Sequence, residues 1–298
     1  MVLIVGASGQ VGSRAVAHAQ GAGLSVRAVT RDPSKLARAA ERGVEVVRGD
    51  LLSPDWLTSA LEGVDQVVFA AHGLVPPSRR NTPQAVDGEG ARRLIDAAAR
   101  AGVRQFVFVS AGGARTETTV FGRVKRETER HLEASGVPWT VLRPSIFPEN
   151  HALLLLGEPV RAGKAVQFFG AGEERLNWIS ADDVAADAVR CLGDASTLGT
   201  VRELRGSDHM SRREALALVE EALGVQARRQ HLPVGVMRVM RALTPALHPG
   251  LHALIDLALD EIARDGDAPD EVQRADWVGP TRVRDVVRAW AKGATATA

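Results

Sequence analysis

The first twelve residues constrain the fold of this chain more than any other stretch. Four apolar residues, Val2–Val5, have the composition of a buried parallel strand. Glycines at three-residue spacing and then a helix-like run follow at once: Gly6, Gly9, Gly12 and Ser13–Gln20. Glycines between a strand and a helix permit a tight turn, and the free N–H groups and dipole of the helix favour an anion. The stretch therefore predicts the pyrophosphate site of a dinucleotide rather than a purely structural turn.

Composition excludes several functional classes. Hydrophobic residues make up 45% of the 298 and charged residues 24%, as in ordinary globular proteins, and the net charge of +1 suggests neither nucleic acid nor an acidic membrane as the main partner. The single cysteine, Cys191, excludes an internal disulfide and a cysteine metal cluster, and its apolar surroundings favour a buried thiol. No run is long enough to span a membrane, and a core strand opens the chain, so we expect no signal peptide and a cytoplasmic protein.

Apolar strands alternate with helical patterns along the first half of the chain. After Val2–Val5, strands are predicted at Ser25–Thr30, Val44–Val47, Gln66–Ala71, Gln105–Ser110 and Pro138–Leu142. This rhythm predicts an α/β fold, a Rossmann doubly wound parallel sheet with helices on both faces. We expect residues 1–150 to form the nucleotide-binding domain, with 176–205 contributing to it. Residues 151–298 should form mainly a smaller C-terminal α/β substrate lobe.

The residues after the second strand bear on the choice of coenzyme. Thr30, Arg31 and Asp32 stand about 20 residues past the glycine turn, where an acidic residue would hold the ribose 2′-hydroxyl of NAD. The guanidinium of Arg31, with Lys35 close behind, instead suits a 2′-phosphate. We therefore favour NADP(H) over NAD(H). Asp32 leaves the choice open, because it either takes the NAD role or caps the helix that starts near Pro33.

Other candidates stand at the carboxyl ends of later strands, where open α/β sheets bind ligands. Asp50 either approaches the adenine or caps the helix Pro54–Leu61. His72 follows the fourth strand, but a lone histidine is more often a loop residue than a proton donor. Ser110 either hydrogen-bonds a substrate oxygen or closes a turn through its own backbone.

The pattern changes after Asn150 to short strands and apolar helices. Strands are predicted at Lys164–Phe169, Leu176–Ser180 and Val201–Arg205, and helices at Val184–Leu192, Ser211–Leu223, His231–Leu243, Leu251–Arg264 and Thr281–Lys292. Ser211 and Glu214 form a plausible capping box. The tail Gly293–Ala298 is expected to be disordered. No spacing of His, Cys or acidic residues suits a metal, so we expect none.

The run of motifs resembles the NmrA-like branch of the atypical short-chain dehydrogenase/reductase family. The match covers most of residues 1–205 and thins toward the C-terminus. It rests on Gly6–Gly12, Thr30–Asp32 with Lys35, Gly49–Leu51, Lys125, Glu129, Ser135–Pro138, Thr140, Leu142–Pro144, Phe147, Glu149–Asn150 and Ile179–Ala185. The resemblance is specific for the fold and for a nicotinamide dinucleotide. It does not specify a substrate, because the family includes quinone reductases, other small-molecule reductases and NADP-binding redox sensors.

The resemblance implies a set of cofactor contacts by position. Gly6, Ser8, Gly9, Gln10, Val11 and Gly12 would cradle the pyrophosphate; Arg31 and Lys35 would meet the adenosine phosphate; Asp50 and Leu51 would approach the adenine; Ala71, His72 and Gly73 would line the ribose; Pro144, Ser145, Ile146 and Phe147 would border the nicotinamide. Asn150, His151 and Trp178 are the expected substrate contacts, because they fall near that last loop and a lobe boundary.

One departure from the family pattern is informative. Typical short-chain dehydrogenases use a Tyr-x-x-x-Lys pair in which the phenol donates a proton, and here the register reads Phe121 to Lys125 in a chain without tyrosine. Four-residue spacing places both side chains on one helix face. Lys125 would hydrogen-bond the nicotinamide ribose or, if desolvated, serve as the acid itself, unless it belongs to the charged surface. Ser110 is the second catalytic candidate.

These features predict an NADP(H)-dependent reductase that passes a hydride to a quinone-like or conjugated acceptor. A quinone tolerates the missing tyrosine, because its reduced form delocalises the negative charge that a localised alkoxide would concentrate. The expected partner is an apolar or aromatic small molecule, not nucleic acid or membrane, and the protein is a monomer or homodimer. The alternatives are a non-catalytic NADP-binding redox sensor and a redox-neutral isomerase, dehydratase or cyclase on the same scaffold.

Overall fold

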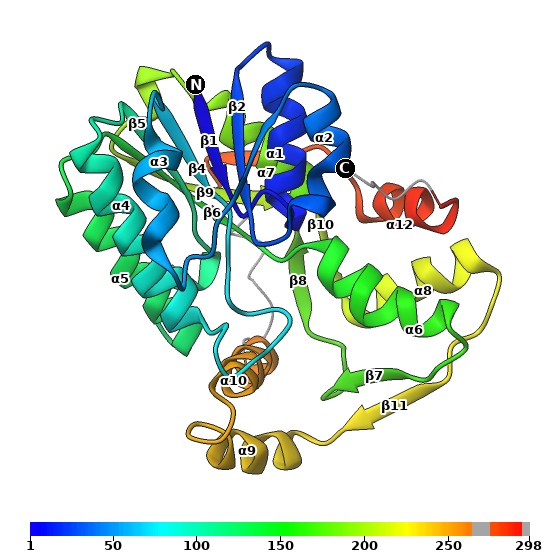
Figure 1. The fold of residues 1–298 in the computed structure, drawn as a ribbon. Coiled ribbons are helices and arrows are strands. Elements are labelled where there is room, and N and C mark those ends of the chain that lie inside the picture. Colours follow the sequence, from blue (N-terminus) through cyan, green and yellow to red (C-terminus); the bar gives the residue numbers. More distant parts are fainter. Residues whose placement is uncertain (264–274, 294–298) are drawn as a thin grey trace.

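An eight-stranded parallel sheet forms the centre of the computed structural model, which describes residues 1–263 and 275–293 (Figure 1). Its strands are β1 (Val2–Val5), β2 (Val26–Thr30), β3 (Glu45–Arg48), β4 (Gln66–Phe69), β5 (Gln105–Val109), β6 (Trp139–Pro144), β9 (Thr200–Gly206) and β12 (Trp277–Gly279). They are ordered β12-β9-β6-β5-β4-β1-β2-β3. Val2 of β1 pairs with Val26 on one side and with Gln66 on the other. The chain therefore reverses direction across the sheet between β1 and β4, where such folds bind nucleotides.

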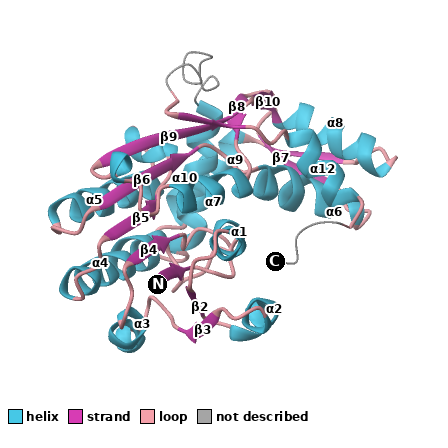
Figure 2. Cartoon of the chain, turned by 90° about the horizontal axis from the view of Figure 1, so that it is seen from above, coloured by secondary structure: helices cyan, strands magenta, loops and turns pink. Residues whose placement is uncertain are grey.

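Helices cover both faces of this sheet, which confirms the predicted doubly wound fold (Figure 2). The helices around the sheet are α1 (Gln10–Gly21), α2 (Ala37–Glu41), α3 (Leu57–Leu61), α4 (Ala91–Arg100), α5 (Val120–Ala134) and α7 (Ala181–Arg190), with short turns η1 (Pro33–Leu36), η2 (Pro54–Trp56), η4 (Gly112–Arg115) and η6 (Ala195–Thr197) and a π-helical turn η3 (Gln84–Gly90) before α4. One apolar cluster packs α1 and α7 on one face, and a second packs α3, α4 and α5 on the other. Because both faces are covered, the strands are apolar without alternation.

The second lobe contains two small two-stranded sheets and several helices. Its elements are η5 (Glu149–Gly157), α6 (Glu158–Arg161), β7 (Val166–Phe169), β8 (Arg175–Trp178), β10 (Asp208–Ser211), α8 (Arg212–Leu223), β11 (Arg229–Leu232), α9 (Val234–Leu243), α10 (Pro249–Ala263) and α12 (Val283–Ala291). Trp178 and Trp290 belong to its apolar core. The predicted capping box is present, since Ser211 and Glu214 each accept a hydrogen bond from the other's backbone. The chain returns to the main sheet through α7 and β9, and again through β12.

One predicted helix start was wrong, and one short strand was missed. His231 lies in β11, which pairs in parallel with β7, and the helix begins only after Pro233, because proline is favoured at the start of a helix and not inside it. The strand Trp277–Gly279, before the last helix, was not predicted. A strand of three residues is too short to show a hydrophobic periodicity in the sequence. Trp277–Gly279 is a strand because it pairs with β9, which is a tertiary contact. Arg264, the predicted end of one helix, and the tail after Gly293 lie outside the described residues.

Cys191 is buried at the end of α7, as predicted. Burial raises the pKa of its thiol to about 11, so the thiolate is scarce at neutral pH. None of the described helices combines the length and the apolar composition that a membrane span requires.

The close backbone contact between the end of β9 and the end of β8 requires glycine at position 206. A Cβ atom at this residue would lie 1.6 Å from the carbonyl oxygen of Trp178. We expect Gly206→Ala to lower the free energy of unfolding by about 3 kcal/mol or more, since the backbone has to move apart. Gly21→Ala is the matched control, because no atom lies within 4 Å of its Cβ position, and it should be neutral or slightly stabilising. Urea denaturation midpoints of both variants check this, and equal midpoints would contradict it.

Candidate functional site

The turn after β1 approaches the neighbouring strand more closely than a side chain allows. Gly6 has a φ of +82°, and a Cβ there would lie 2.7 Å from the backbone nitrogen of Ala71. A Cβ at Gly12 would lie 2.2 Å from the carbonyl oxygen of Gly6. Both positions therefore require glycine, one for its φ and its contact and the other for helix packing.

The first turn of α1 is open to an anion. The amide of Gly9 donates to the Gly6 carbonyl at 2.9 Å, which closes the turn. Among the described residues, no side chain caps the helix and no acidic residue stands in its first turn. Ser8, Gly9 and Gln10 are exposed, and Val11 is buried in the core below them. The arrangement offers backbone N–H groups and a helix dipole to a phosphate.

A hollow of about 310 Å³ opens past the ends of β2 and β3. It is lined by Arg31, Arg48, Gly49, Asp50, Ser53, Asp55 and Trp56. Arg31 also contacts Asn81, with Nη1 3.3 Å from Oδ1. The lining of this hollow thus contains two guanidinium groups and the carboxylates of Asp50 and Asp55. Arg48 had not been singled out from the sequence, because it lies at the end of an exposed strand.

The acidic residues of this region have structural partners. Asp32 accepts hydrogen bonds from the amide and the hydroxyl of Ser34 at the start of η1, and these bonds lower the pKa of its carboxyl. The capping role predicted for Asp32 is thus present. Asp50 accepts from the amide of Leu52 at 3.0 Å. Lys35 is exposed and is absent from the residues that line the hollow, and the carbonyl of Leu51 accepts from Arg93.

The loop after β4 is fixed by Asp87, a fully buried residue of η3. Its Oδ2 accepts from the amide of Gly73 at 2.8 Å, and a Cβ at Gly73 would meet the Thr82 carbonyl oxygen at 2.3 Å. His72 is exposed at the surface of the same loop, and its Nδ1 accepts from the amide of Leu74. The protein atoms around the ring lower the pKa of His72, although the charge of Asp87 opposes the shift.

Lys125 is buried rather than part of the charged surface of α5. Its Nζ lies 2.8 Å from Oδ1 of Asp87 and donates to the carbonyl of Val109 at 2.9 Å. The rings of Phe69, Phe108 and Phe121 surround the ammonium, with centroids 5.9, 4.8 and 5.5 Å away. Phe121 and Lys125 thus share a helix face, as the spacing predicted. A buried ammonium needs such an anion and such ring faces to offset its desolvation.

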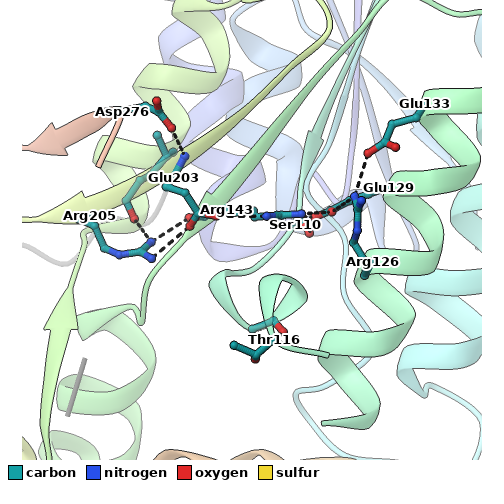
Figure 3. A network of polar contacts seen from close by, with 11 residues as sticks. Ser110, Thr116, Arg126, Glu129, Glu133, Arg143, Glu203, Arg205 and Asp276 are labelled. Carbon is teal, nitrogen blue, oxygen red and sulfur yellow. Dashed lines mark hydrogen bonds and ion pairs between the residues drawn. The ribbon is translucent and has the colours of Figure 1, made fainter. Parts of the chain in front are cut away.

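A second buried ion pair lies one turn further along α5 (Figure 3). Glu129 accepts from Nη2 of Arg143 at 2.5 Å and from the hydroxyl of Ser110 at 2.5 Å. Burial by itself would raise the pKa of Glu129, but the hydrogen bonds from Arg143 and Ser110 outweigh it and hold the pKa below its usual value. Arg143 continues to Glu203, which also pairs with Arg205. The Ser110 hydroxyl hydrogen is therefore committed to Glu129.

The loop after β6 carries the four residues expected beside a nicotinamide. The amide and hydroxyl of Ser145 donate to the Leu204 carbonyl and to Asn177, and the Ile146 carbonyl accepts from the amide of Ile179. The Phe147 carbonyl accepts from the amides that follow it at the start of η5. Pro144 closes β6. These bonds fix the loop against the second lobe. The Ile146 and Phe147 carbonyls thus accept hydrogen bonds from the protein's own amides.

The three expected substrate contacts are not equivalent. Asn150 is partly exposed at the start of η5, whereas Trp178 is fully buried and donates to the Met210 carbonyl. His151 meets Trp178 edge to face, and its Nδ1 lies 3.4 Å from Nη2 of Arg212, which pairs with Glu261 of α10. Burial lowers the pKa of His151 to about 4, so its ring is neutral at pH 7.

A larger hollow of about 530 Å³ lies between α9, α10 and the segment before α5. Its lining is mixed and consists of Thr118, Val234, Arg238, Arg241, Asp256, Leu259, Asp260, Ile262 and Ala263. Asp256 also accepts from the amide of Val120 at 2.8 Å, which ties α10 to the start of the helix that carries Phe121. Within the described ranges, no three His, Cys, Asp or Glu side chains come together as metal ligands would.

The sequence interpretation missed Asp87, although it lies in the run that leads into α4. A carboxylate on a predicted helix has no visible partner in the sequence, and Lys125 is far from it along the chain. Glu129 was noted only as part of a motif, although its four-residue spacing from Lys125 already placed the two side chains on one face.

Comparison with known proteins agrees with this geometry. A family model described as NAD(P)H-binding matches residues 6–195. The NAD(P)H azoreductase of Xenophilus azovorans is 33% identical over 245 residues, which cover 82% of this chain and 80% of that protein. The photosystem II assembly factor Ycf39 of a Synechocystis species is 30% identical over 271 residues, 90% of this chain and 81% of the relative.

Solved structures give the same result. The structure of the NADPH-dependent quinone oxidoreductase QOR2 from Escherichia coli, complexed with NADPH, superposes with a TM-score of 0.73. It is 25% identical, and the alignment covers 97% of this chain and 99% of that one. The likeness therefore includes both lobes.

The Glu129–Arg143 pair should make stability depend on pH. Because the pKa of Glu129 is lowered by folding, its contribution is present above its unfolded pKa of about 4.5 and is lost as the pH falls through the folded value. We expect Glu129→Gln to lower the free energy of unfolding by about 3 kcal/mol at pH 7, with a smaller difference from wild type below pH ~4.5.

Glu133→Gln is the matched control, since Glu133 accepts from Arg126 at the partly exposed end of the same network and should cost at most about 1 kcal/mol. Urea unfolding from pH 7 to pH 4 measures all three proteins. A Glu129→Gln deficit that stays constant over this range would show that the carboxylate charge is unimportant.

Proposed function

Because the chain belongs to the NAD(P)H-binding family, we propose that it is an NADP(H)-dependent reductase of a quinone-like or conjugated small molecule. The predicted resemblance to the NmrA-like reductases and the assignment to the NAD(P)H-dependent oxidoreductases are confirmed at the level of family and class. The coenzyme preference and the acceptor are the proposal. The single observation that carries it is the surroundings of Lys125.

The residues fit a nicotinamide dinucleotide. The turn Gly6–Gly12 provides a cradle that a Cβ atom would fill, and the uncapped first turn of α1 faces the pyrophosphate position. Ala71–Gly73 and Pro144–Phe147 are the strand exits on which the ribose and the nicotinamide would rest. The bound coenzyme supplies the hydride.

Lys125 helps to position the bound coenzyme and does not donate a proton to the substrate. Its Nζ donates to the Val109 carbonyl and forms an ion pair with Asp87, and Phe121 brings a ring where typical short-chain dehydrogenases bring a phenol. The Ser110 hydroxyl donates to Glu129. Neither group is poised to give a proton to a new alkoxide, so the site suits an acceptor that needs none during hydride transfer. A quinone meets this requirement, because its reduced form spreads the charge and takes a proton from solvent afterwards.

The acceptor has a place beside this helix. The hollow of about 530 Å³ adjoins the start of α5, and its volume is typical of small-molecule sites. Its apolar lining from Val234, Leu259 and Ile262 suits an aromatic molecule. Asn150, His151 and Trp178 stay as predicted substrate-side residues, with Trp178 acting through His151.

Arg31 and Arg48 support the preference for NADP(H). Replacing either guanidinium by Arg31→Ala or Arg48→Ala should raise the Kd for NADPH about tenfold, the value of one charge-assisted hydrogen bond, and change the Kd for NADH less than twofold. Arg42→Ala is the control, since Arg42 is exposed nearby and is not among the residues lining the hollow. Fluorescence titration measures these constants, and equal losses for both coenzymes would contradict the preference.

The acceptor class is tested by steady-state oxidation of NADPH. We expect turnover with benzoquinones and naphthoquinones and at least about 100-fold lower kcat/KM with unactivated ketones, because a positioned proton donor contributes that factor. Ketone reduction at the quinone rate would overturn the proposed acceptor.

A second function, a non-catalytic NADP-binding regulator, is favoured by the similarity to the assembly factor Ycf39. The same panel separates the two functions. Saturable NADPH binding without oxidation by any acceptor would identify the regulator and exclude the reductase.

A further inference from the structure

Helix α9 turns an apolar face to solvent. Nine large apolar side chains are exposed in the described part of the chain, and four of them lie within twelve residues. These four are Val236, Val239, Leu243 and Leu247, with exposed fractions of 45, 59, 64 and 66%, and we call them the α9 ridge. Spacings of three and four residues place the first three on one helix face. Met237, on the other face, is buried against α10.

The chain around the α9 ridge is basic, which the net charge of +1 conceals. Residues 224–255 contain four arginines and three histidines and no aspartate or glutamate. Arg229 pairs with Glu220 and Arg241 with Asp256. Arg238 is exposed and has no ion-pair partner among the described residues.

Further basic residues lie near the far end of the ridge. Gly250, three residues after Leu247, packs on Ser78 so tightly that a Cβ would lie 2.4 Å from the Ser78 carbonyl oxygen. Arg79 and Arg80 follow Ser78 and are exposed. Figure 1 shows α9 at the edge of the molecule opposite the N-terminus, with α10 between it and the sheet. The apolar face is thus the outermost surface of this edge, with positive charge beside it.

We propose that the α9 ridge docks the protein on the surface of a lipid bilayer that contains anionic lipids. Apolar side chains on the solvent face of a helix, with arginine beside them, are the features that insert into a headgroup region. The side chains would lie among the acyl chains, and the flanking guanidinium groups would meet lipid phosphates.

A second copy of the chain fits this surface less well. A two-fold interface through the α9 ridge would bring two basic surfaces together, and like charges repel. Four partly exposed Val and Leu side chains also provide only a few hundred Å², whereas a stable dimer buries about 800 Å² on each partner. A bilayer requires neither a matching groove nor acidic side chains.

Docking would place the larger hollow at the membrane surface, because α9 carries the ridge and also lines the hollow. Val234 and the exposed Arg238 line the hollow, and Val239 and Leu243 of the same helix face solvent. A lipid-soluble molecule would then reach the hollow without crossing bulk water.

Vesicle binding of the full chain tests this proposal independently of any activity. Cosedimentation is measured with phosphatidylcholine vesicles and with vesicles that contain one quarter phosphatidylglycerol. We expect binding to the anionic vesicles that weakens with salt, and a loss of more than about tenfold in the double variant Val239→Glu, Leu243→Glu, which places charges on the ridge. Arg238→Gln should weaken binding about fivefold, the contribution of one basic residue near a membrane.

Leu198→Glu is the matched control, because Leu198 is exposed to 38% and lies in the loop before β9, outside the ridge. It should bind as wild type does. NADPH affinity and the thermal unfolding midpoint of the ridge variant, which should equal those of wild type, show that it is folded. Absence of binding to anionic vesicles, or equal binding of the ridge variant, would overturn the proposal. A concentration-dependent dimer that the ridge variant abolishes, without vesicle binding, would assign the ridge to a second copy.

Discussion

The close approach between the turn after β1 and the exit of β4 is the constraint on which the site depends. The Cβ that is missing at Gly6 would lie within 3 Å of the Ala71 backbone, so the two strand ends meet main chain to main chain. This contact brings the uncapped start of α1 beside the loop Ala71–Gly73. The pyrophosphate cradle and the ribose position are therefore parts of one rigid edge, at the point where the sheet reverses its winding.

Two buried charged side chains of α5, Lys125 and Glu129, also hold that edge of the sheet in place. Lys125 reaches Asp87, which in turn fixes the amide of Gly73, and Glu129 reaches Arg143 at the end of β6. Two ion pairs one helical turn apart thus connect α5 to η3 and to β6. Each partner would be costly alone in the interior, so the pairs specify one arrangement of helix and sheet. The helix that typically presents a catalytic phenol here serves as a clamp, with a phenylalanine above the ammonium.

The second lobe combines a closed apolar core with a helix whose apolar side chains are partly exposed to solvent. Its core around Trp178 and Trp290 is closed, whereas α9 is packed on one face and open on the other. The same helix lines a hollow and carries an outward apolar face. Helix α9 packs on α10, and α10 is tied to the start of α5 by the hydrogen bond that the amide of Val120 donates to Asp256.

The sheet, the glycine turn and the absence of a phenolic proton donor could all be predicted from the residues in order, because apolar runs, short-range spacing and residue identity are local properties. The sequence also placed Phe121 and Lys125 on one face, since helical periodicity fixes that relation. Only the tertiary structure decided which charges meet. Asp87 reaches Lys125 across the gap between η3 and α5, and Ser110 turns to Glu129 rather than to an open site, because partners far apart in the chain leave no periodic signal. The three-residue strand β12 and the solvent-facing side of α9 were likewise decided by which neighbours pack there, and a single sequence does not encode neighbours in its local pattern.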